Sequence, residues 1–175
     1  VRLGCAVEAT DDADVLAVTA PTFRPDRLFS LEEDYIKQLG ASAGEEISTL
    51  DNLLSAIEKR LNYFVVKGCK ISDHGFEKFP HGYASYEEAK RLFERRAALR
   101  AEEKDAFFGF LLVWLSKQYQ KRGMIMQLHF SVVRNNNAQM FRSCGADSGF
   151  DLISGEQNVT DMIVFLNQMQ EEERP

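Results

Sequence analysis

The stretch Met124-Ile-Met-Gln-Leu-His-Phe-Ser-Val-Val-Arg-Asn-Asn-Asn137 indicates how this chain folds. It opens with a short apolar run directly after Gly123, which follows a long amphipathic segment. It closes in a polar cluster that contains His129 and Arg134. Buried strands that deliver polar side chains at their carboxyl ends are the means by which α/β barrels present chemistry. We therefore predict a buried parallel strand whose end contributes to a functional site.

Two earlier segments repeat this design. Arg24 lies in Pro21-Thr-Phe-Arg-Pro-Asp26 and His74 lies in Ser72-Asp-His-Gly75, each after an apolar run. A guanidinium at a strand end suits bidentate capture of a carboxylate or phosphate, whereas a surface arginine that pairs with Asp26 contributes only ~0–1 kcal/mol. An imidazole beside a glycine can approach a ligand closely, but Asp-His-Gly is also ordinary turn chemistry. Both interpretations of each segment stay open on these residues alone.

The composition is that of one soluble globular domain. The chain has 175 residues, of which 45% are hydrophobic and 27% charged, and this length can bury a core. With 21 Lys+Arg against 27 Asp+Glu, the net charge is −6, which argues against nucleic acid or an anionic membrane surface as a partner. No run approaches the ~18 apolar residues of a membrane span. Three cysteines without CxxC spacing fit reduced thiols, so we expect a cytoplasmic protein.

Hydrophobic periodicity predicts strands that alternate with helices. Short apolar runs predict strands at residues 1–9, 15–20, 69–72 and 124–128. Three- and four-residue apolar spacing predicts helices at about 26–39 (capped by Asp26 or Ser30), 49–67, 85–99, 101–122 and 158–171. Ser85, with Glu88 three residues later, has the spacing of a capping box and is predicted to open the helix at 85–99. The segments 40–44 and 145–151 are predicted loops, and 136–141 a short helical turn.

This alternation predicts an α/β fold with parallel strands. A closed barrel of this type needs about eight strands, so the few strands seen here predict only part of one. The helical pair at 85–122 is longer than a minimal crossover and is predicted to be an insertion.

The histidines are candidates for acid–base or metal chemistry. A lone histidine on an apolar strand is more often a hydrogen-bonded core residue, but Arg134 follows His129 closely and weakens that interpretation. Two histidines do not complete a catalytic zinc site, which normally has three protein ligands, and the sequence has no HxH or HExxH. Asp147 and Asp151 lack the acidic density of an EF-hand loop, so we reject calcium.

Taken together, the strand ends resemble those of the uronate isomerase (glucuronate isomerase) family. The segments that carry the resemblance are Pro21-Thr-Phe-Arg-Pro-Asp26, Gly68-Cys-Lys-Ile-Ser-Asp-His-Gly75, and Met126-Gln-Leu-His129 with Arg134-Asn-Asn-Asn137. Thr10-Asp-Asp12 and Gly145-Ala-Asp-Ser-Gly-Phe-Asp151 agree as well. The resemblance covers the chain from about Glu8 onward, and several motifs in the same order are far more specific than one.

That family belongs to the amidohydrolase superfamily and has a distorted TIM (β/α)8 barrel. The resemblance therefore implies that residues 1–175 form a single partial barrel domain, about strands three to six with a helical insertion, without the N- and C-terminal barrel parts. It implies an isomerase of hexuronate catabolism that interconverts D-glucuronate with D-fructuronate and D-galacturonate with D-tagaturonate. The implied step is proton transfer through a cis-enediol.

The resemblance also implies roles for four residues. Arg24 and Arg134 would bind the sugar acid, with Arg24 on its carboxylate. His74 and His129 would be catalytic, and they stand where the superfamily commonly binds metal. A divalent metal such as zinc is implied for the full-length protein, and none is assured by this segment. We also expect a homo-oligomer.

The chain departs from the family pattern. The first-strand HxH, the His-Tyr pair after it and the eighth-strand Asp-x-Arg are absent, and the connection after Thr10-Asp-Asp12 is too short for a parallel crossover. We therefore expect a fragment that is inactive by itself. Two alternatives remain: a metal-dependent hydrolase of the same superfamily, which a carboxylated lysine in place of Arg24 would favour, and a non-catalytic assembly fragment with open sheet edges.

Overall fold

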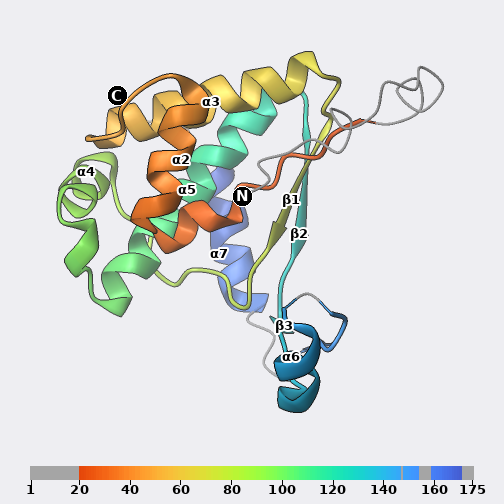
Figure 1. The fold of residues 1–175 in the computed structure, drawn as a ribbon. Coiled ribbons are helices and arrows are strands. Elements are labelled where there is room, and N and C mark those ends of the chain that lie inside the picture. Colours follow the sequence, from red (N-terminus) through yellow and green to blue (C-terminus); the bar gives the residue numbers. More distant parts are fainter. Residues whose placement is uncertain (1–19, 147, 154–158, 171–175) are drawn as a thin grey trace.

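The computed structural model describes residues 20–146, 148–153 and 159–170. The strands predicted at 1–9 and 15–20 lie outside these ranges, apart from Ala20. Figure 1 shows the long helices gathered on one side of a strand pair, with the short segment that contains β3 (Val132–Val133) and α6 (Ala138–Cys144) beyond the strand ends. Within the described ranges, none of the helices is both long and apolar enough to cross a membrane.

Parallel strands form the part of the fold that positions the site. Strand β1 (Ile71–Gly75) pairs in parallel with β2 (Ile125–His129), and their carboxyl-terminal residues lie opposite each other. On the other edge of β1, Phe23 forms a parallel bridge with Ser72, held by backbone hydrogen bonds of 3.1 and 2.9 Å. The polar residues that follow these three segments are therefore delivered to the same edge of the sheet.

The helices largely follow the predicted ranges. They are α2 (Glu33–Ala43), α3 (Leu50–Val66), α4 (Tyr86–Glu94), α5 (Ala101–Lys121), α6 (Ala138–Cys144) and α7 (Val159–Gln170), with 3₁₀ turns η2 (Asp26–Ser30) and η3 (Arg96–Ala98). The hydroxyl of Thr49 accepts the N–H of Asn52, and the hydroxyl of Ser85 accepts that of Glu88. These caps satisfy amide groups that a first helical turn leaves without partners, and the second confirms the predicted cap of α4.

Three local predictions were wrong, and one strand pair was missed. Asp26 does not cap a helix, because its carboxylate turns to β1 instead. Helix α2 continues through Gly40 to Ala43 and is capped by Gly44, whose positive φ of 70° suits a C-terminal cap. Strand β1 extends to Gly75 rather than ending at Ser72. The antiparallel pair β3 (Val132–Val133) and β4 (Leu152–Ile153) was not predicted.

The helix α5 lies at the centre of the core. It is packed between the other long helices and the strands, and the side chains Leu53, Leu61, Phe93, Phe107, Leu111 and Leu115 are completely buried there. Burial of one such side chain contributes about 1.5–3 kcal/mol. On another face of α5, Phe79, Leu112 and Phe165 form a second cluster that anchors α7. The carboxyl end of α5 is thereby held beside β1.

Candidate active site at the strand ends

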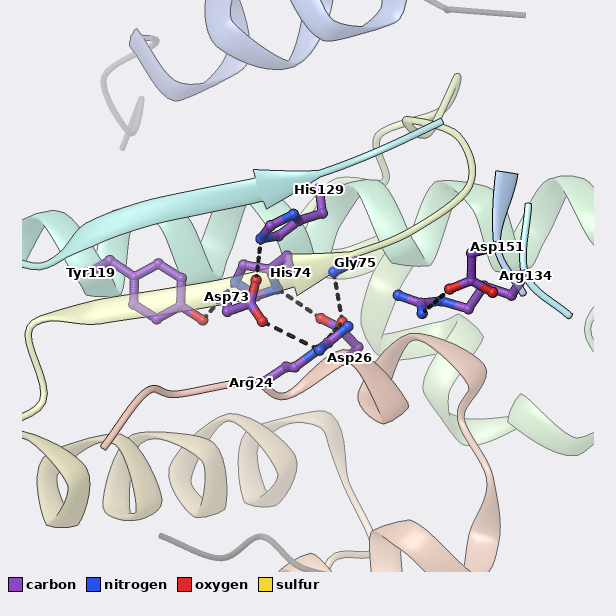
Figure 2. A network of polar contacts seen from close by, with 9 residues as sticks. All are labelled: Arg24, Asp26, Asp73, His74, Gly75, Tyr119, His129, Arg134 and Asp151. Carbon is purple, nitrogen blue, oxygen red and sulfur yellow. Dashed lines mark hydrogen bonds and ion pairs between the residues drawn. The ribbon is translucent and has the colours of Figure 1, made fainter. Parts of the chain in front are cut away.

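Arg24 joins carboxylates from two segments. Its Nε lies 3.2 Å from Asp26 Oδ2, and its Nη1 lies 3.3 Å from Asp73 Oδ2 on β1. The surface pairing with Asp26 considered above is therefore present, but it belongs to a larger network (Figure 2). The side chain is about half exposed, so the guanidinium is held by the protein and still faces solvent.

Asp26 is the centre of the buried part of this network. Its Oδ1 lies 3.1 Å from His74 Nδ1, and its Oδ2 accepts the backbone N–H of Gly75 at 2.7 Å. Burial acts to raise the pKa of Asp26, but the hydrogen bonds from His74 and Gly75 outweigh this effect and hold the pKa below 3.8. Asp26 is therefore a carboxylate that ties the segment after Phe23 to the end of β1.

His74 is fully buried, with both ring nitrogens engaged. Its Nδ1 faces Asp26, and its Nε2 lies 3.0 Å from the hydroxyl of Tyr119 on α5. Figure 2 shows the imidazole between Tyr119 and Asp26. The turn considered for this segment is not formed, because His74 is the fourth residue of β1 and points into the interior.

His129 has a different environment. It ends β2, its side chain is 50% exposed, and its Nε2 lies 2.9 Å from Asp73 Oδ1. The same carboxylate holds Arg24 through its other oxygen. Asp73 thus orients an imidazole that faces the open end of the strands, an arrangement suited to proton transfer.

Arg134 directly follows strand β3. Its Nη1 lies 3.0 Å from Asp151 Oδ2, and the N–H of Asn135 donates to the other oxygen of Asp151 at 3.0 Å. A cavity of about 390 Å³ lies beside it, lined by Gly75, Phe76, Glu77, Val132, Val133 and Arg134. Asp151, the residue directly before β4, therefore supplies the carboxylate that holds Arg134 at this cavity.

Gly75 lies where the two arginines converge. A Cβ at this position would be 2.7 Å from Nη2 of Arg24 and 3.2 Å from Nη2 of Arg134. Only a residue without a side chain leaves both guanidinium groups this close to the backbone. Two converging guanidinium groups form a site for an anion with two or more oxygens, such as a carboxylate.

The structure brings three of the four predicted site residues, Arg24, His74 and His129, into one connected network, and places Arg134 beside Arg24 at Gly75. Sequence reasoning did not assign site roles to Asp26, Asp73, Tyr119 or Asp151. Asp26 and Asp73 lie inside the motifs quoted for Arg24 and His74, so their place in those motifs could have identified them as site residues. Tyr119 follows the apolar spacing of α5 and carries no local signal of its own.

The described residues do not fit a catalytic metal centre. Among them, no group of three or more His, Cys, Asp or Glu side chains is arranged to hold a metal ion. Both nitrogens of His74 are engaged by protein groups, and the nitrogen of His129 that faces Asp73 is engaged as well. A catalytic zinc ion normally has three protein ligands, and the described residues bring no such set together.

Comparison with known proteins identifies the family of this chain. Residues 3–174 match the family described as glucuronate isomerase. The chain belongs to the glucuronate isomerase family. A uronate isomerase of Photorhabdus laumondii is 41% identical over 159 residues, and one of Histophilus somni is 38% identical over 172 residues.

The family match extends to the fold and concerns only part of the relatives. The crystal structure of a uronate isomerase from Thermotoga maritima superposes with a TM-score of 0.77 at 29% identity, and the match covers 85% of this chain and 35% of that one. The matches cover 86% and 94% of this chain but 33% and 36% of the Photorhabdus and Histophilus proteins. The chain thus spans about a third of the length of the curated relatives that it matches.

Proposed function

We propose that the protein is a uronate isomerase of hexuronate catabolism, and that its strand ends form part of the active site. The reaction interconverts an aldose and a ketose uronate: D-glucuronate with D-fructuronate, or D-galacturonate with D-tagaturonate. The observation that supports this most directly is the convergence of Arg24 and Arg134 at Gly75. A uronate carries one permanent anionic group, and this pair of cations matches it.

In this proposal the two arginines bind the substrate carboxylate. Arg24 has Nε and Nη1 on Asp26 and Asp73, so its Nη2 is the nitrogen directed to Gly75. Arg134 is likewise anchored through Nη1 and directs Nη2 to the same glycine. Each guanidinium is therefore oriented before the substrate arrives, which lowers the entropy cost of binding.

His129 is proposed to move the proton. Isomerisation of an aldose to a ketose transfers a proton between adjacent carbons, and a cis-enediol is the intermediate that such a transfer implies. The half-exposed ring of His129, oriented by Asp73, supplies an acid–base group at the strand ends. The buried His74 serves the same site through Asp26, as a positioning residue without contact to the substrate.

We further infer that the parallel strands belong to a distorted (β/α)8 barrel and represent about its third to sixth strands. The parallel register of Phe23, β1 and β2, and the helical pair α4–α5 between β1 and β2, support this assignment. The 175 residues are then one partial barrel domain, and this segment alone is inactive. Any divalent metal would need ligands from beyond the described residues. The same proposal includes a homo-oligomer in the cytoplasm.

The test is Arg24→Lys in the full-length protein, with Arg27→Lys as the matched control. Arg27 lies in the same segment but pairs with Glu32. Lysine keeps the charge and loses the planar fork, including the hydrogen bonds to two carboxylates. Hydrogen bonds to charged groups contribute about 1.5–3 kcal/mol, so the KM for the uronate should rise about ten- to hundredfold.

The measurement is steady-state conversion of D-glucuronate and of D-galacturonate, with the ketose product quantified. The control variant should keep the KM of the unmodified protein within about twofold, because an exposed ion pair contributes little. An unchanged KM in Arg24→Lys would contradict the assignment of the carboxylate site. Full turnover by the isolated 175 residues would contradict the inferred inactivity of this segment.

A further inference from the structure

The buried hydroxyl of Tyr119 on α5 contacts His74 on the side opposite Asp26. Tyr119 is 1% exposed, and its hydroxyl lies 3.0 Å from Nε2 of His74, which is not exposed at all. The rest of the ring packs among apolar groups, including an edge-on contact with Phe23 at 6.2 Å between centroids. A phenylalanine would make these packing contacts equally well. The hydroxyl therefore has a purpose beyond filling space.

The two hydrogen bonds that link Tyr119, His74 and Asp26 run in the same direction, with each group donating to the next one toward Asp26. Asp26 is a carboxylate and accepts only, so in the neutral imidazole the proton resides on Nδ1 and is donated to it. The other nitrogen, Nε2, is then an acceptor, and the Tyr119 hydroxyl must donate to it. Burial raises the pKa of Tyr119 well above 10, so the hydroxyl keeps its proton.

Through these hydrogen bonds, Tyr119 on α5 is linked to Asp26 and so to Arg24, the proposed ligand of the substrate carboxylate. With Oδ1 of Asp26 facing His74, Oδ2 receives the backbone N–H of Gly75 and the Nε of Arg24. The orientation of the carboxylate thus decides where the guanidinium and the glycine lie relative to the cavity. An imidazole that turned to find another partner for Nε2 would release Oδ1 and loosen both.

We propose that Tyr119 is a positioning residue, which holds His74 in a single tautomer and orientation so that Asp26 keeps Arg24 directed at the substrate carboxylate. This proposal rests on the proposed function, because it assumes that Arg24 binds the uronate. It concerns a residue on a helix outside the strand ends.

The decisive variant is Tyr119→Phe in the full-length protein, with Tyr83→Phe as the matched control. The hydroxyl of Tyr83 is also buried, but it has no hydrogen-bond partner among the described residues. Each substitution removes one buried oxygen and keeps an aromatic ring. Only Tyr119→Phe should leave Nε2 of His74 buried without a hydrogen bond.

Two readouts are needed. The first is the pair of imidazole ¹⁵N resonances of His74, assigned by their loss in His74→Gln. The unmodified protein should show a protonated Nδ1 and a hydrogen-bonded, unprotonated Nε2, and in Tyr119→Phe the Nε2 resonance should move to that of a nitrogen without a hydrogen bond. The second is kinetics: KM should rise about fivefold, the equivalent of one lost neutral hydrogen bond, while kcat changes by less than about twofold.

The outcomes separate the two claims. If Tyr119→Phe keeps both the Nε2 resonance and the KM of the unmodified protein, Tyr119 has only a packing role and the proposal is overturned. If Tyr83→Phe raises KM equally, the effect is a general consequence of altering the core and the proposal also fails. If the unmodified protein converts no uronate, the proposed function fails, while the ¹⁵N resonances still decide whether Tyr119 holds His74.

Discussion

Replacement of Asp26 by asparagine is the most informative single perturbation of this molecule. The carboxylate accepts hydrogen bonds from His74 Nδ1 and from the Gly75 amide, and it pairs with Arg24 at 3.2 Å. Asparagine has nearly the same shape but only one acceptor atom. Its amide group must therefore face either His74 or Gly75, each of which is itself a donor.

The expected loss of stability follows from these contacts. One hydrogen bond to a charged group is lost, at about 1.5–3 kcal/mol, and two donors are left facing each other in a largely buried site. The Arg24 contact adds little because that guanidinium is about half exposed. The free energy of unfolding should therefore fall by about 2–4 kcal/mol at neutral pH.

The pH dependence has a definite sign. The pKa of Asp26 is lower in the folded protein than its usual 3.8, chiefly because the hydrogen bonds from His74 and Gly75 outweigh the effect of burial. A lowered folded-state pKa contributes stability that is fully present above the unfolded pKa and is lost as the pH falls through the folded pKa. The difference between the unmodified protein and Asp26→Asn should thus be largest near neutral pH and shrink below about pH 4.

The assay is urea unfolding of the full-length protein, followed by circular dichroism at a series of pH values. Glu94→Gln is the control, because the side chain of Glu94 is exposed and makes no hydrogen bond or ion pair with the described residues. It should change the unfolding midpoint little at any pH. The reasoning is refuted if Asp26→Asn is no more destabilising than the control, or if the difference stays constant as the pH falls.

Two further predictions concern the open side of the site. Gly75→Ala should raise the KM for the uronate about tenfold, because the added methyl group would push Arg24 and Arg134 apart. The free energy of unfolding should change by less than about 1 kcal/mol, because the methyl group meets only the ends of two flexible side chains. Unchanged steady-state kinetics would contradict the convergence of the two guanidinium groups. His129→Gln should lower kcat about 10²- to 10⁴-fold with KM changed far less; a change in KM alone, measured in the same assay, would assign His129 to binding.

The local elements were predictable because their causes are local. Apolar spacing predicted α3 and α5 to within about two residues. The Ser85 cap was read from a hydroxyl and a glutamate three residues apart. The same local logic failed at Asp26, which has the residue type of a helix cap. Its carboxylate instead meets His74 and Gly75, residues nearly fifty positions away that local patterns do not include.

The sequence by itself predicted which segments would contribute to a site, since Arg24, His74, His129 and Arg134 were each inferred from motifs at the ends of predicted strands. Only the tertiary structure decided which of these side chains are buried and which groups they contact. It buried His74 between Asp26 and Tyr119, left His129 half exposed on Asp73, and brought two guanidinium groups to one glycine. The physical reason is that a motif sets residue type and spacing along the chain. Burial and hydrogen-bond partners depend on which strands and helices pack together.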